Sequence, residues 1–186
     1  MTVNERTHRF GAAFLFALAV AGGAHAAAAD RSTGLKLTGD KPIQIESDKL
    51  EIKEKENTAI FTGNVSVTQG DTLMKSGRMV VLYAKGEGSA ATGSAAIDRI
   101  EADGKVYLKS ATQVATGDAG VFDMKSEVFV LTGKEVVLSE GENVIVGCKL
   151  TVQMKTGRAQ LDGCGGNSGS SGRIKMLISP NSAKTQ

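Results

Sequence analysis

The sequence predicts an all-β protein built as a stacked or rolled antiparallel sheet. Three observations support this class: short alternating segments, regular turn signals between them, and an internal repeat. The 186 residues include two prolines, Pro42 and Pro180, so no proline interrupts strand pairing between them. Turn signals such as Gln69-Gly70-Asp71 recur without an amphipathic helical pattern between them, which is typical of all-β domains.

Residues 1–26 predict a cleaved secretory signal peptide. A basic start precedes an uncharged, mostly apolar run from Phe10 to Ala24, and Ala24-His25-Ala26 fits the small-x-small cleavage pattern. The apolar run is shorter than the roughly 20 residues that span a bilayer, which argues against a retained anchor. Cleavage removes both histidines, His8 and His25, and with them the usual general base near neutral pH and every imidazole metal ligand.

Composition narrows the functional classes. Lys and Arg number 22 against 20 Asp and Glu, so the net charge of +2 gives no strong attraction to nucleic acid. Two cysteines are too few for a disulfide-dense scaffold or a four-cysteine zinc site. We expect no enzymatic activity, no catalytic residue, no cofactor and no metal site.

The remaining elements follow in order along the chain. Residues 27–36 are small and polar and predict a disordered lead-in to a domain over residues 37–178. In the stretch from Val144 to Met154 the even positions are mostly apolar, which predicts a strand with a single buried face. A flexible loop follows over residues 163–172, then a last strand, and residues 179–186 predict a disordered tail.

The repeat places two aspartates at equivalent positions. Asp48 precedes Gly63 by 15 residues, and Asp118 precedes Gly133 by the same number. Two copies with the same turn placement predict one supersecondary unit used twice. Paired carboxylates can serve acid–base chemistry, as in a secreted carbohydrate-active enzyme. With no third catalytic group identifiable, a role in turns and strand edges is the better interpretation.

Three blocks carry a resemblance to a known family. They are Ile43-Gln44-Ile45-Glu46-Ser47-Asp48, the stretch from Phe61 to Gly70 with its Thr-Gly-Asn-Val core, and Phe129-Val130-Leu131-Thr132-Gly133. The chain resembles the OstA-like family over roughly Leu37 to Ile178. The resemblance implies a twisted, open antiparallel β-jelly roll in the periplasm, whose interior shields the acyl chains of lipopolysaccharide. It also implies head-to-tail copies that connect an LptC-like inner-membrane partner to an LptD-like outer-membrane translocon.

The resemblance assigns lipid binding to the inward face of the roll. The candidate residues are Ile43, Ile45, Val65, Val67, Val106, Leu108, Phe122 and Met124. The same residues fit a closed core, which would make the protein a structural β-solenoid scaffold of the cell envelope. Aromatic residues are only 4% of the chain, so little bulk is available to close a wide roll, and this favours an open interior.

Assembly is expected through the two strand edges. The N-terminal edge is predicted from Pro42 to Ile52 and the C-terminal edge from Arg173 to Ile178. Their candidate contact residues are Ile43, Ile45, Leu50, Ile174, Met176 and Ile178. Unpaired edges template further strand pairing, and a head-to-tail joint that does not close produces a filament.

The two cysteines, Cys148 and Cys164, leave two outcomes open. A hairpin centred on Thr156-Gly157 would pair Val152 with Leu161 and place the cysteines on opposite faces. A bulge in the glycine-rich stretch would realign them, and export to an oxidising compartment would then allow a disulfide.

Overall fold

The structure, a computed structural model, describes residues 41–86, 88–165 and 172–180, all within one unit of residues 31–186. The predicted signal peptide, the lead-in over 27–36, most of the 163–172 loop and the tail beyond Pro180 lie outside the described residues. The all-β class is confirmed: ten strands form one sheet, and every pairing between them is antiparallel. No helix within these ranges is long and apolar enough to cross a bilayer.

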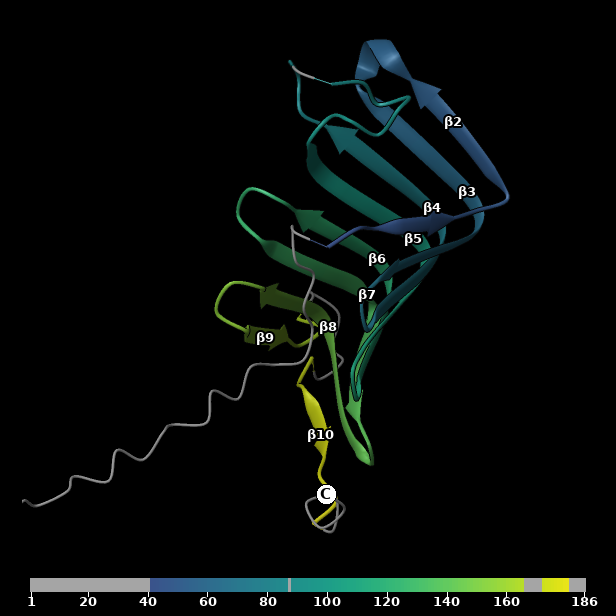
Figure 1. The fold of residues 1–186 in the computed structure, drawn as a ribbon. Helices are drawn as coiled ribbons and strands as arrows, with labels where there is room; N and C mark the ends of the chain where they lie inside the picture. The colour runs from purple at the N-terminus through teal and green to yellow at the C-terminus, as the bar shows by residue number, and fades with distance from the viewer. Residues whose placement is uncertain (1–40, 87, 166–171, 181–186) are drawn as a thin grey trace, which may run out of the picture. The chain divides into compact units, whose positions relative to one another are not determined.

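The order of the strands in the sheet is nearly their order in the sequence (Figure 1). Its strands are β1 (Gln44–Glu46), β2 (Lys49–Lys53), β3 (Thr58–Gln69), β4 (Thr72–Tyr83), β5 (Ile97–Ser110), β6 (Gln113–Asp123), β7 (Val128–Glu140), β8 (Asn143–Gln153), β9 (Arg158–Asp162) and β10 (Lys175–Leu177), with a 3₁₀ turn at Glu54–Glu56. The order is β1-β3-β4-β5-β6-β7-β8-β10, while β2 also pairs with β3 and β9 with β8. The six long strands β3 to β8 are therefore successive antiparallel neighbours, as short connections favour.

The connections differ between the two ends of the long strands. At one end, which we call the tight-turn end, two residues join each pair: 70–71, 111–112 and 141–142. Gly70, Ala111 and Gly141 adopt positive φ there, as two-residue hairpins require. At the opposite end, which we call the loop end, the connections are 84–96, 124–127 and 154–157.

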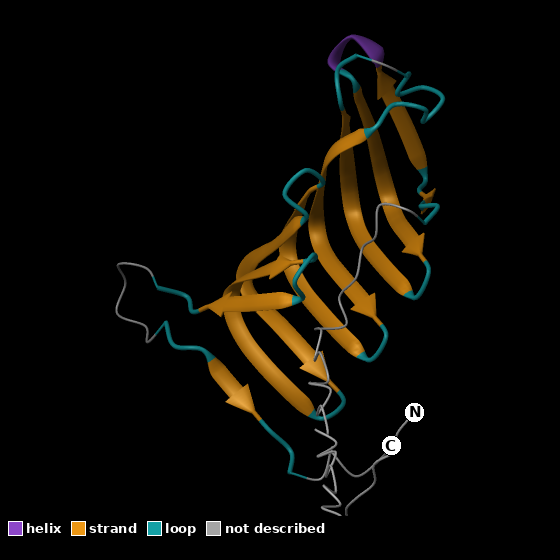
Figure 2. Ribbon diagram, turned by 60° about the vertical axis from the view of Figure 1, so that its left-hand side comes forward, coloured by secondary structure: helices purple, strands orange, loops and turns teal. Residues whose placement is uncertain are grey.

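A glycine interrupts each long strand near its middle, and we call this row the glycine line. Its members are Gly63, Gly77, Gly104, Gly117, Gly133 and Gly147. The register of every pairing from β3–β4 to β7–β8 shifts beside these glycines. A Cβ on Gly77 would lie 3.2 Å from the Gly104 carbonyl oxygen, so a side chain there would require the neighbouring backbone to shift by a few tenths of an ångström. Such bulges bend strands, and Figure 2 shows the long strands curving along their length.

The bend changes which positions of a strand face inward. In the second half of β8, Leu150 and Val152 are fully buried. In the first half the inward positions are Ile145 and Gly147, because they lie opposite Leu138 and the buried Val136. The prediction of a single apolar face from Val144 to Met154 is therefore wrong in the first half, where the inward positions are odd-numbered.

One face of the sheet carries the core. Its largest fully buried side chains are Phe129, Met79, Leu108, Leu131, Leu150, Val65, Val81, Val106, Val136 and Val152. Burying a side chain of this size contributes about 1.5–3 kcal/mol relative to leaving it exposed. Buried apolar side chains on this face come from all six long strands, so their packing stabilises the bent sheet.

The two edges differ from the predicted strands. The single strand expected from Pro42 to Ile52 is two strands, β1 and β2, which pair with β3 on either side of its bulge. The strand expected from Arg173 to Ile178 shortens to β10, which pairs with the first part of β8, while β9 occupies the second part. The β8–β9 turn is centred one residue earlier than expected, so Val152 lies opposite Ala159 rather than Leu161.

The repeated aspartates hold the bulges. Asp48 Oδ2 accepts a hydrogen bond of 2.9 Å from Asn64 Nδ2, and the Asp48 N–H donates to the Gly63 carbonyl at 3.0 Å. Asp118 Oδ2 accepts one of 2.8 Å from the Lys134 N–H. Strands β3, β4 and β5 separate β2, which begins just after Asp48, from the Asp118 strand β6, so the structure does not pair these carboxylates. The turn-and-edge interpretation fits Asp48, which lies between the edge strands β1 and β2. It is wrong for Asp118, which lies at a bulge in the middle of the central strand β6.

Candidate functional site: an apolar groove

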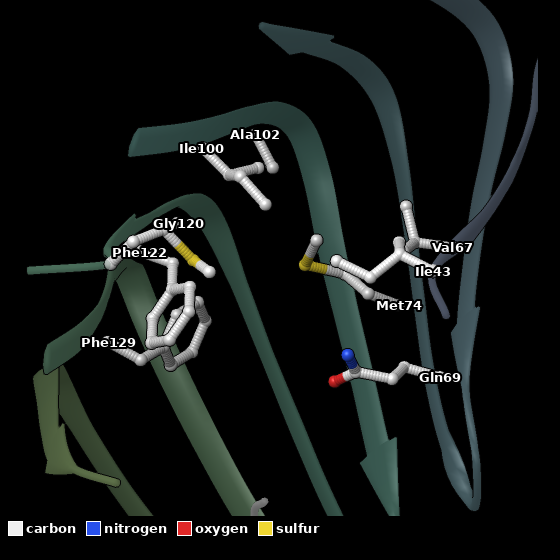
Figure 3. A pocket seen from close by; sticks show the side chains of 10 residues that line it. Ile43, Val67, Gln69, Met74, Ile100, Ala102, Gly120, Phe122 and Phe129 are labelled. Atoms are coloured by element: carbon white, nitrogen blue, oxygen red, sulfur yellow. The ribbon is translucent and has the colours of Figure 1, made fainter. Parts of the chain in front are cut away.

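An apolar groove runs along the inward face from β1 to β7 (Figure 3). Its lining residues are Ile43, Val67, Gln69, Met74, Ile100, Ala102, Gly120, Phe122, Met124 and Phe129. The hollow between these side chains is partly open to solvent. None of the ten residues is ionisable, so the lining favours uncharged, apolar chains.

Cross-strand register brings these residues together. Val67 lies opposite Met74, and Phe122 lies opposite both Ile100 and Phe129. Directly opposite residues in an antiparallel pair share a face, so each set lies on the inward face. The two sets belong to different cross-strand rows, because Met74 lies opposite Leu108 and Ile100 lies opposite Val81. Ala102 and Gly120 also lie opposite one another, and their small size leaves the hollow between the larger side chains. A Cβ on Gly120 would come within 3.2 Å of the Phe129 ring.

The structure divides the eight predicted lipid-binding residues into two groups. Ile43, Val67, Phe122 and Met124 line the groove. Val65, Val106 and Leu108 are only 1–2% exposed and lie in the packed part of the interior, with the half-buried Ile45 packed against the same core.

Sequence reasoning missed six of the lining residues: Gln69, Met74, Ile100, Ala102, Gly120 and Phe129. Phe129 stood within a recognised family block, yet its side-chain direction depends on the strand bend. The register shifts at the glycine line decide which positions face inward, and alternation alone does not reveal them.

The groove's single polar lining residue is Gln69. Its side chain is 5% exposed, and its Nε2 donates a hydrogen bond of 2.9 Å to the Lys41 carbonyl. Figure 3 shows the amide group at one end of the groove, with Phe122 and Phe129 across from it. Among the described residues, no cluster of three or more His, Cys, Asp or Glu side chains is placed to hold a metal ion.

The inward face exposes apolar side chains at both edges of the sheet. Leu50 and Ile52 lie opposite Phe61 and Ala59, yet they are 49% and 36% exposed. Met176, opposite Ile145, is 60% exposed. Ile174 and Ile178 share its alternation and are also exposed. The apolar face is therefore not closed off within the described chain at either edge.

A disulfide joins Cys148 to Cys164, whose Cα atoms lie 4.9 Å apart. Cys148 lies at the bend of β8, and Cys164 follows the last residue of β9 by two positions. The β8–β9 register alone would place residue 163 opposite Cys148. Because β9 ends at Asp162, residues 163 and 164 are not held in the β8–β9 register, and Cys164 can bond to Cys148.

Two titratable groups lie at the loop end. Partial burial raises the pKa of the Tyr83 phenol above its usual value, so this residue stays neutral around pH 7. The hydroxyl and N–H of Ser126 both donate hydrogen bonds of 2.7 Å to Asp123 Oδ1. These two bonds lower the pKa of the Asp123 carboxyl and fix the β6–β7 turn.

Comparison with known proteins identifies relatives of this sheet and groove. Residues 44–158 match the family model described as LptA/(LptD N-terminal domain) LPS transport protein. An uncharacterized protein of Rhizobium meliloti is 54% identical over 159 residues, covering 86% of this chain and 82% of the relative. The lipopolysaccharide export system protein LptA of Escherichia coli K12 is 30% identical over 130 residues, covering 65% of this chain and 64% of that protein.

A solved structure shares the fold. LptH of Pseudomonas aeruginosa, the periplasmic LptA homologue of the lipopolysaccharide transport device, superposes with a TM-score of 0.61. The match covers 80% of this chain and 99% of LptH, at 19% identity, and confirms the open antiparallel fold that the sequence predicts. With the family model spanning most of the sheet, the chain belongs to the OstA-like family of LptA and LptD N-terminal domain proteins, and LptA is among its relatives.

Proposed function

We propose that this protein binds lipopolysaccharide in the apolar groove and carries it through the periplasm towards the outer membrane. The observation that carries the proposal is a groove lined by ten residues, none of them ionisable, on the inward face of an open sheet. Such a lining suits extended acyl chains, because burying apolar surface is favourable and no charge needs to be desolvated. Family membership supplies the lipid class.

Two features favour this function over a closed scaffold, and a third argues against an enzyme. The groove opens to solvent, and the inward face ends in the exposed side chains of Leu50 at one edge and Met176 at the other. A closed core would cover such side chains. Nor does the groove lining offer an acid, base or nucleophile, so we assign the site no enzymatic reaction.

Head-to-tail copies would extend the groove. The outer edges of β1 and β2 carry no further strand within the described chain, and neither do those of β9 and β10. One copy's C-terminal edge joined to the next copy's N-terminal edge would place Met176 and Ile178 beside Leu50 and Ile52. Lipid would then pass between copies without meeting water. The same edges would receive an LptC-like partner at the inner membrane and an LptD-like partner at the outer membrane.

Photo-crosslinking in living cells tests the proposal. A photoreactive residue at Met74 or Met124 faces the groove, whereas one at Val121 lies on the opposite face of β6. We expect adducts with lipopolysaccharide at Met74 and Met124 and none at Val121. Absence of lipopolysaccharide from both groove positions, in a variant that is exported and folded, would contradict the proposed function.

A further inference from the structure

A row of polar side chains crosses the sheet at its tight-turn end, one from each long strand. We call it the polar ladder, and its members are Gln69, Thr72, Ser110, Gln113, Glu140 and Asn143. Each member lies directly opposite the next in the strand register. The row is therefore continuous from β3 to β8.

The polar ladder belongs to the inward face. Gln69 lines the groove, and Thr72 and Ser110 are only 4% and 3% exposed, with their hydroxyl oxygens 3.0 Å apart. Directly opposite residues share a face, so Gln113, Glu140 and Asn143 continue the row on the same side. The inward neighbours of Thr72 and Ser110 along their strands are the buried Met74 and Leu108.

The loop end of the same face is apolar. Its corresponding margin is formed by Tyr83, Ile97, Met124 and Met154, each packed against the core. The interior thus changes character from one margin to the other: hydroxyl, amide and carboxylate groups lie at the tight-turn end, whereas hydrocarbon and thioether groups with one phenol, that of Tyr83, lie at the loop end. Solubility alone does not explain this difference, because both margins border solvent.

The polar ladder carries acceptor atoms that suit a ligand with hydrogen-bond donors. The Glu140 carboxylate accepts bonds of 2.8 Å from the Thr112 hydroxyl and 3.2 Å from Gln113 Nε2. Gln113 Oε1 is buried and receives no hydrogen bond from the described part of the chain. A buried acceptor of this kind costs about 1–3 kcal/mol unless a donor meets it. The six ladder residues themselves include no lysine or arginine.

We propose that the groove binds its lipid in one direction, with the acyl chains towards Phe122 and Met124 and a hydroxyl- or amide-bearing head group at the polar ladder. This inference rests on the proposed function and adds the orientation and the chemistry of the recognised head. Neutral sugar hydroxyls and amide N–H groups supply the donor that Gln113 Oε1 lacks.

A pair of photoreactive lipids tests the direction. Each is an N-acylglucosamine, with a diazirine either at the end of the acyl chain or on the sugar. The full chain is irradiated with each probe, and the adducts are mapped by mass spectrometry. We expect the sugar probe to label residues 69–72, 110–113 and 140–143. The chain-end probe should label Phe122, Met124 and Phe129.

The outcomes separate the two proposals. Sugar adducts at the loop end, or the same adducts from both probes, would overturn the direction while leaving lipid binding in the groove intact. Adducts outside the inward face with both probes would overturn the proposed function itself.

A matched substitution tests the chemistry. Gln113→Met removes the unsatisfied acceptor at similar size, and Gln153→Met makes the same change at an exposed position beside the inward Val152. We expect Gln113→Met to weaken binding of the N-acylglucosamine about fivefold, the effect of one hydrogen bond. Binding of the donor-free methyl ester of the same fatty acid should stay unchanged, as should both affinities in Gln153→Met. Equal loss for both lipids, or no loss for the sugar lipid, would overturn head-group recognition at Gln113.

Discussion

The Asp118 carboxylate accepts a hydrogen bond of 2.8 Å from the backbone N–H of Lys134, across the bulge between β6 and β7. At the equivalent repeat position, the Asp48 carboxylate accepts from the side-chain amide of Asn64, and the Asp48 N–H donates to the Gly63 carbonyl at the bulge of β3. A bulge leaves a backbone group outside the strand ladder, and a neighbouring carboxylate can satisfy it. The repeated Asp and Gly residues therefore lie together at bulges, where the aspartate hydrogen bonds stabilise the bend of the sheet.

Asp118→Ala should therefore destabilise the fold by about 1 kcal/mol, the net value of one such hydrogen bond. The free energy of unfolding in urea measures the effect. Asp98→Ala provides the matched control, because Asp98 is also exposed on a central strand and its carboxylate makes no hydrogen bond within the described residues. Equal destabilisation by both changes would show that the bulge contact is not the cause.

Gly147→Ala should destabilise by about 1–3 kcal/mol, because a Cβ there would lie 2.6 Å from the Asp162 carbonyl oxygen and the backbone must move. Gly165→Ala should be close to neutral, since a Cβ at Gly165 meets nothing within 4 Å. Thermal or urea unfolding of the two variants gives the comparison. A stable Gly147→Ala protein would mean that the glycine line is not needed for close backbone approach.

Replacing Cys148 and Cys164 together with serine should lower the free energy of unfolding by about 3 kcal/mol, because the bond closes a loop of 16 residues in the unfolded chain. Reducing agent should have the same effect on the native protein and none on the double variant. If the reduced and oxidised proteins unfold at the same urea concentration, the disulfide does not stabilise this fold.

Met124→Asp should reduce lipopolysaccharide binding at least tenfold while leaving the β circular-dichroism spectrum unchanged, because Met124 lines the groove and is only half-buried. Val121→Asp places the same charge on the outer face of β6 and should bind normally. Fluorescent-lipid displacement measures both affinities. Val106 is less suitable for this test, because at 2% exposure an aspartate there would disrupt the core.

Deleting residues 173–186 should leave a folded monomer that no longer forms concentration-dependent oligomers. β10 makes three residue pairs with β8, and its side chains are exposed, so its loss costs the core little. Deleting only residues 181–186 keeps β10 and should preserve association. Sedimentation of the three chains over a range of concentrations decides, and identical behaviour would show that β10 is not the joint.

The sequence predicted the strand class because alternation and turn signals are local. The two-residue turn at Gly70 and the strand around Val67 follow directly from neighbouring residues. The family resemblance then assigned eight candidate lipid-binding residues, of which Ile43, Val67, Phe122 and Met124 line the groove.

What alternation did not predict depends on the bulges. Each register shift changes the inward positions, so Ile145 rather than Val146 faces inward in β8, and Met74 and Phe129 meet in one groove from distant strands. The sequence also predicted one N-terminal edge strand where the structure has two, β1 and β2. Asp48 lies between them, and its hydrogen bond with Asn64 is a long-range contact that local alternation does not reveal. The Cys148–Cys164 bond depended on where β9 stops, which no local signal fixed.

The glycine line and the tight turns give every central hairpin the same bent profile. Gaining or losing one central hairpin would change the length of the groove without altering its cross-section. Two strands at about 4.8 Å spacing make each such step about 10 Å. Length and chemistry are therefore separable properties of this architecture, and duplication of a single hairpin is a direct route from a short apolar groove to a longer one.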